Sequence, residues 1–248
     1  RTADATKNPT LLAEFLLSDY LFDEDATDAE PLYKLRRWRG EYYFYDSGRY
    51  VRVSDDTVKQ NVTHWLQLYS SGPQYELTVN QNLVRNVLLN INPMINIRER
   101  QELNTWLNGD NRGQIISVEN GLLCLKQDAE SGPTLIGHTP NYFTTVCLPY
   151  PYDATAACPE WELFLGDIMR CRQDYIDLLQ EFIGYLFRPD LREQKFLLCT
   201  GEGANGKGTL FDVVQSLVGI ENCSQVPICR FGERFALYGT LGKVVNLT

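Results

Sequence analysis

Residues 201–211 of the chain read GEGANGKGTLF, a run of closely spaced glycines with a lysine at the start of an apolar helical pattern. In a phosphate-binding loop, glycines let backbone N–H groups curl around an anion, and the lysine reaches the β- and γ-phosphates. The pattern departs at one position: Gly208 follows Lys207, where such loops carry the hydroxyl that binds Mg²⁺. Thr209 offers a hydroxyl one residue later. The stretch predicts a nucleotide-binding loop, and the alternative is a glycine turn with a surface lysine.

The flanking sequence has the order that a phosphate-binding loop requires. Before the loop, residues 194–200 (QKFLLCT) form an apolar run of strand length, and after it residues 209–219 (TLFDVVQSLVG) predict a helix that ends at Gly219. Strand, glycine turn and helix in this order favour the nucleotide interpretation.

Helical spacing recurs in the preceding part of the chain. We expect a first helix after the N-cap Asn8, a second capped by Asp55 or Asp56, and a third over residues 79–91 that ends before Pro93. From Pro159 onward the apolar spacing is helical again.

Two hairpins are predicted between these helices. Residues 33–53 (YKLRRWRGEYYFYDSGRYVRV) place aromatic-rich segments on both sides of a turn at residues 46–48, and residues 115–126 (IISVENGLLCLK) place the turn at Asn120–Gly121. The predicted fold class is therefore α+β: mainly helical with β-hairpins, followed by the start of a P-loop α/β domain.

The amino-acid composition and net charge of the chain argue against several classes of protein. The net charge of −9 argues against a general nucleic-acid coat, although a local basic patch remains compatible with it. Seven cysteines without a C-x-x-C pair, and only two histidines, argue against a disulfide framework and a zinc site, and favour free thiols in a reducing cytoplasm. No apolar run is long enough to span a bilayer, so no membrane partner is expected.

Several phrases occur in an order that resembles one family: ENGLLCLK, GHTPNYFTTVCLPYPYDATAACPEWELFL, LQEFIGYLF and QKFLLCTGEGANGKGTLFDVV. The chain resembles phage, plasmid and poxvirus-type primase–helicases, in the region that precedes and enters their superfamily 3 AAA+ helicase motor. The resemblance covers most of the chain, from about residue 36 onward.

The resemblance implies an ATP-driven DNA helicase that serves replication of a mobile element in a bacterial cytoplasm or at a site of virus replication. It implies ATP and Mg²⁺ as cofactors, a hexameric ring of the chain itself, single-stranded or forked DNA, and an attached primase domain or other replication proteins. The expected domains are residues 1–155, a hairpin and helical region; 156–190, a helical collar; and 191–248, an incomplete P-loop ATPase domain.

Carried over residue by residue, the resemblance assigns the triphosphate to the glycine loop, with Lys207 as the catalytic residue and Thr209 as the candidate Mg²⁺ ligand. Asn205 would orient the γ-phosphate side. The ATP-binding residues are Gly201, Gly203, Asn205, Gly206, Lys207, Gly208 and Thr209. The family's second strand, which carries its acidic residues, would correspond to residues 241–248 (LGKVVNLT). Because no acidic motif follows before residue 248, we expect ATP turnover from the intact parent protein and not from this stretch alone.

Two further sets of basic residues are candidates. Basic residues interleaved with aromatics in the first hairpin suit contacts with single-stranded DNA, and the alternative is a half-buried hairpin with solvated arginines. These residues are Lys34, Arg36, Arg37 and Arg39. Arg230 and Arg234 are candidate arginine fingers, and surface arginines are the alternative.

The leading interpretation is a collar with the beginning of an ATPase motor. A second interpretation is a non-catalytic module for oligomerisation or for docking DNA or proteins. A small-molecule kinase with the same loop is a third and weaker one, since its substrate domain would have to follow the loop.

Overall fold

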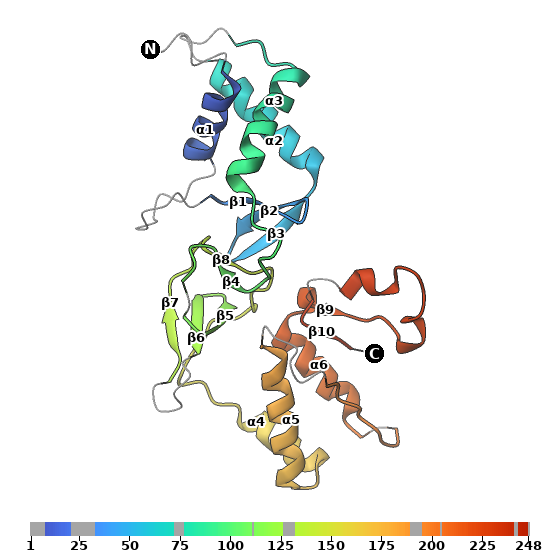
Figure 1. Cartoon of the computed structure of the whole chain (residues 1–248). Helices are drawn as coiled ribbons and strands as arrows, with labels where there is room; N and C mark the ends of the chain where they lie inside the picture. Colours follow the sequence, from blue (N-terminus) through green and yellow to red (C-terminus); the bar gives the residue numbers. More distant parts are fainter. Residues whose placement is uncertain are drawn as a thin grey trace. The chain divides into compact units, whose positions relative to one another are not determined.

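The computed structural model describes residues 8–20, 33–71, 77–110, 112–125, 132–188, 195–203, 205–240 and 243–247. The chain divides into two compact units: residues 1–110 with 139–145 (the first unit), and residues 111–138 with 146–248 (the second unit). The described residues form six α-helices and four small sheets, of which three are antiparallel (Figure 1). The fold is therefore mixed α and β, as the sequence predicts.

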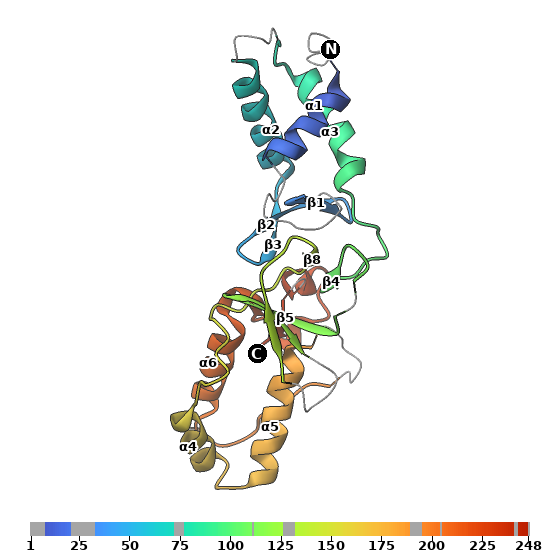
Figure 2. The same cartoon turned by 90° about the vertical axis from the view of Figure 1, so that its left-hand side faces the viewer.

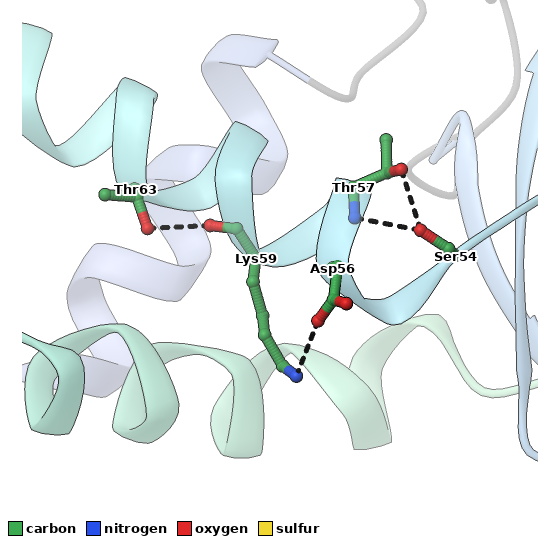
Figure 3. Close-up of polar contacts among 5 residues, drawn as sticks. All are labelled: Ser54, Asp56, Thr57, Lys59 and Thr63. Carbon is green, nitrogen blue, oxygen red and sulfur yellow. Dashed lines mark hydrogen bonds and ion pairs between the residues drawn. The ribbon is translucent and has the colours of Figure 1, made fainter.

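Each of the three described helices of the first unit begins at a capping side chain. Helix α1 (Pro9–Tyr20) starts after Asn8, whose Oδ1 accepts the Thr10 N–H at 3.0 Å, which confirms the predicted cap. Helix α2 (Asp55–Ser70) is capped by Ser54, and the prediction of an aspartate cap is wrong by one residue (Figure 3). Ser54 has the extended backbone that an N-cap needs, whereas Asp55 lies in the first turn, where its charge suits the helix dipole.

Helix α3 (Gln81–Ile95) is longer than predicted. It begins after Asn80, whose Oδ1 accepts the Leu83 N–H at 2.9 Å, and it continues through Pro93. The residues on either side, Ile91 and Ile95, are completely buried in the core of the first unit. Their burial offsets the backbone hydrogen bond that proline cannot make.

A three-stranded antiparallel sheet supports these helices. Strands β1 (Leu35–Trp38), β2 (Glu41–Asp46) and β3 (Arg49–Val53) pair in sequence order, which confirms the first predicted hairpin. One face of the sheet packs on α1–α3, and the other packs on the short pair β4 (Thr105–Trp106) and β8 (Tyr142–Phe143) (Figure 2). Because both faces are covered, aromatic residues occur at successive positions of β2.

The second unit contains the second hairpin, with its turn one residue earlier than predicted. Strands β5 (Gln114–Val118) and β6 (Gly121–Leu125) pair Val118 with Gly121, so the turn residues are Glu119 and Asn120. Strand β7 (Thr134–Ile136) follows on the other edge of β6. A Cβ at Gly121 would overlap the Ile136 carbonyl oxygen, so this glycine is needed for the close approach of β7.

The remaining helices of the second unit are α4 (Pro159–Ile168), α5 (Gln173–Leu186) and α6 (Lys207–Val218), and α4 starts at the predicted proline. Their core centres on Leu165, Leu179 and Leu210. Strands β9 (Cys223–Ser224) and β10 (Val245–Asn246) form a two-stranded parallel pair, and β10 lies within the second strand predicted near the end of the chain.

The strand predicted before the glycine loop does not form in the described residues. Residues 195–200 are without sheet pairing, although Leu197 and Cys199 pack on the helical core while Phe196 and Leu198 are exposed. The alternation of packed and exposed side chains is typical of a β-strand. A strand in a sheet also needs a neighbouring strand that pairs with its backbone N–H and C=O groups. The predicted domain boundaries at residues 155 and 190 stay predictions. No helix in the described part of the chain is long and apolar enough to cross a bilayer.

Candidate functional site: the glycine loop at the start of α6

Gly206 ends the glycine loop and begins α6. Its φ of 84° is left-handed, a conformation that other residues adopt only at a cost. A Cβ at this position would lie 2.7 Å from Ile168 Cγ2 and 3.4 Å from the Phe164 ring. Gly206 is therefore required twice, for its backbone angle and for the contact of the loop with α4.

Lys207, the first residue of α6, folds back over the loop. Its Nζ donates to the Gly201 carbonyl oxygen at 2.8 Å, to the Glu202 carbonyl oxygen at 3.1 Å and to Asn205 Oδ1 at 2.9 Å. These contacts hold the ammonium group at the mouth of the loop, among acceptors that are themselves exposed. The sequence prediction that Lys207 reaches back over the loop agrees with this geometry.

The start of α6 is electrostatically positive. Among the described residues no side chain caps this end, and its first turn carries no acidic residue. The first N–H groups of a helix have no partner within the helix, so they face solvent or a ligand. Burial raises the pKa of the nearby Cys199 thiol, while the Lys207 charge acts in the opposite direction.

The other predicted loop residues fall into two groups. At Gly201 a Cβ would overlap the Asn205 side-chain amide, so the loop closes tightly there. At Gly203 and Gly208 a Cβ would meet nothing within 4 Å. Thr209 is exposed in the first turn of α6, one position beyond Gly208. The loop thus has room for a hydroxyl side chain at residue 208, although the sequence places it at residue 209.

The support of the loop by α4 escaped the sequence analysis. Phe164 and Ile168 belong to the apolar spacing that predicts α4, so the sequence marks them as core residues. Their contact with Gly206 joins segments about 40 residues apart, and periodicity within one helix does not identify the element against which it packs.

The basic residues of the first hairpin do not form one patch. Arg36 and Arg37 are consecutive in β1 and point to opposite faces of the sheet, since Arg36 pairs with Tyr43 and Arg37 with Tyr42. Three arginines lie over aromatic rings: Arg36 over Tyr33 at 5.6 Å, Arg37 over Tyr42 at 5.6 Å and Arg39 over Trp38 at 4.3 Å. Lys34 precedes the strand and is half-buried. A role of these four residues in DNA binding stays a prediction.

The two candidate arginine fingers make local contacts. Arg230 forms an exposed ion pair with Glu233 at 2.9 Å, and the Arg234 guanidinium lies 5.0 Å from the centre of the Phe235 ring. His138 lies with its Nε2 3.2 Å from the Glu119 carbonyl oxygen, at the turn of the second hairpin. The residues that the structure describes contain no group of three or more His, Cys, Asp and Glu side chains placed to hold a metal ion.

Comparison with known families identifies the region that precedes the loop. The model of the D5 N terminal like family matches residues 35–170, more than half of the chain, from β1 to the end of α4. The glycine loop lies beyond the matched residues. Comparison with curated proteins gives no match. The chain therefore belongs to the D5 N terminal like family, that of the N-terminal regions of phage, plasmid and poxvirus primase–helicases.

Proposed function

We propose that the glycine loop, residues 201–209, binds the triphosphate of ATP in a replication helicase of the primase–helicase type. The observation that carries the proposal is the position of the Lys207 ammonium group, held at 2.8–3.1 Å from three oxygen acceptors of its own loop. These bonds are exposed, and such bonds contribute little net stability. Phosphate oxygens, which bind an ammonium group more strongly because they are charged, would replace them.

Each loop residue has a proposed role. The N–H groups at the start of α6 would hold the phosphates, and Lys207 would neutralise the developing charge during transfer of the γ-phosphate. Asn205 would turn its amide from Lys207 toward the γ-phosphate. Thr209 would bind Mg²⁺ directly or through water, because Gly208 has no hydroxyl.

The experiment is equilibrium binding of a fluorescent ATP analogue to the whole chain, with tripolyphosphate as competitor. Lys207→Ala removes charge-assisted hydrogen bonds, so we expect binding roughly tenfold to a hundredfold weaker. Lys195→Ala is the matched control, because Lys195 is an exposed lysine of the segment that enters the loop, and it should bind as the parent does. Equal affinity of the parent and of Lys207→Ala would refute the site.

A second variant tests the Mg²⁺ role. Because a Cβ at residue 208 meets nothing within 4 Å, Gly208→Ser adds the missing hydroxyl without overlap. We expect it to increase the gain in nucleotide affinity that Mg²⁺ produces, and Thr209→Val to decrease that gain. If neither substitution changes the Mg²⁺ dependence, the metal is not bound at this turn.

A second candidate function is an assembly module, and the surface of α4 and α5 favours it. Leu163 of α4 is 72% exposed, and Tyr175 and Leu178 of α5 are 49% and 56% exposed. Exposed apolar residues on adjacent helices are typical of contacts between copies or with a partner. Light scattering without nucleotide tests this role: a ring that Leu163→Ser and Leu178→Ser reduce to monomers supports the collar, and a monomeric parent chain argues against it.

A further inference from the structure

The first unit contains a cleft of about 820 Å³, bounded by α2, α3 and the strands β1 and β2. We propose that this cleft binds a nucleotide unit, with the phosphate at its basic side chains and the base against its apolar wall. A free nucleotide and a nucleotide within single-stranded DNA offer the same chemistry. The site is separate from the glycine loop, which belongs to the second unit.

The charges that line the cleft are mainly positive. Among the residues that the structure describes, Arg37, Lys59 and Arg85 line it together with one carboxylate, that of Asp55. Lys59 lies on α2 and contacts Asp56 (Figure 3). Its ammonium group is 3.3 Å from Asp56 Oδ1, in an exposed ion pair that a phosphate could replace. This positive lining occurs in a chain with a net charge of −9, so it is a local feature rather than a property of the whole surface.

Arg37 brings a guanidinium group to the cleft, over the Tyr42 ring at 5.6 Å. Because Arg37 is only half-buried and lines the cleft, its guanidinium is placed to donate to a phosphate oxygen. Burial raises the pKa of the Tyr42 hydroxyl. The charges of Arg37 and Lys59 lower this pKa and the charge of Asp55 raises it, so all three charges act on one phenol at the cleft.

The rest of the lining suits a base. Val84 and Leu88 are buried apolar residues that form a wall, and the first residues of α3 add the side-chain amides of Gln81 and Asn82. The Tyr42 hydroxyl donates to Asn92 Oδ1 at 2.6 Å, and Asn92 also lines the cleft. Amides both donate and accept, as base edges do, and the volume is within the usual range of small-ligand sites, about 300–1,000 Å³.

The test uses the whole chain with Lys207→Ala, so that the glycine loop does not contribute to binding. Thymidine monophosphate, an oligothymidylate of about 12 nucleotides and inorganic phosphate are added separately, and backbone NMR shifts are recorded. We expect shifts at Thr63, Asn82 and Arg85 with the nucleotide or the oligonucleotide. Shifts with the monophosphate identify a free-nucleotide site, whereas shifts with the oligonucleotide alone identify a strand-binding site.

The variant Lys59→Gln/Arg85→Gln removes two exposed charges of the cleft, so the fold should be retained. We expect its affinity for the shifting ligand to be at least about tenfold weaker. The matched control is Arg98→Gln, an exposed arginine of the first unit outside the lining, and its affinity should be unchanged. Equal affinity of the double variant and the control, or binding of inorganic phosphate as tight as that of the nucleotide, would overturn the proposal.

Discussion

Gly206→Ala tests the packing that places the loop on α4. The new Cβ would adopt a left-handed backbone at φ 84° and would lie 2.7 Å from Ile168 Cγ2, whereas carbon atoms in contact normally lie about 3.5–4.0 Å apart. The left-handed conformation costs about 1–2 kcal/mol, and the overlap costs about 1–3 kcal/mol. Alanine also lowers the conformational entropy of the unfolded chain, which stabilises the folded state by less than about 1 kcal/mol. We expect the second unit to lose about 2–4 kcal/mol of unfolding free energy.

The assay is urea unfolding of the whole chain labelled with 5-fluorotryptophan and followed by fluorine NMR. Trp161 is the single tryptophan of the second unit and packs beside Phe164 in the α4–α6 core, so its resonance reports the unfolding of this unit alone. The matched control is Gly208→Ala, whose Cβ meets nothing within 4 Å. This control should be neutral or stabilising by up to about 1 kcal/mol, because alanine is the better helix former.

A double variant separates the two costs. Ile168→Ala removes the Cγ2 atom with which the new Cβ collides. In the Ile168→Ala background, the loss of unfolding free energy caused by Gly206→Ala should therefore be smaller by the cost of the overlap. The cost of the left-handed backbone should remain. If Gly206→Ala is as stable as Gly208→Ala within about 0.5 kcal/mol, the contact between the loop and α4 is not as described.

Three further predictions concern other parts of the chain. Ser54→Ala removes the cap of α2 and should lower the unfolding free energy of the first unit by about 1 kcal/mol, as the Trp65 fluorine resonance would report; no change would mean that Asp55 takes over the cap. Asn120→Ala removes two hydrogen bonds to the Tyr152 backbone and should speed hydrogen exchange at the Tyr152 amide, and an unchanged rate would contradict this link. Burial raises the pKa of Tyr150 to about 12, above the unfolded value of about 10, so stability that is present below pH 10 should be lost between pH 10 and 12. Tyr150→Phe should abolish this part of the pH dependence in urea titrations, and an unchanged profile would assign it elsewhere.

The local structure around the site was predictable from sequence. The helix after the loop, its end at Gly219 and the start of α4 at Pro159 all follow from periodicity and from residues with strong backbone preferences. The buried residues Val58, Val62 and Trp65 of α2 have the predicted spacing as well.

Two of the predictions that were wrong concern places where a distant segment outweighs a local preference. Pro93 predicts a helix end, but the burial of Ile95 keeps α3 intact beyond it. Asn120 predicts a turn with Gly121, but its amide exchanges two hydrogen bonds with Tyr152, and the turn lies one residue earlier.

The sequence by itself determined the helices, the two hairpins and which residues form the glycine loop, because these depend on neighbours a few positions apart. Only the tertiary structure decided that α4 supports Gly206, that Arg36 and Arg37 face opposite ways, and that α2, α3 and the first sheet enclose a basic cleft. These features depend on which surfaces bury one another across long stretches of chain, and no local preference of the backbone encodes that choice.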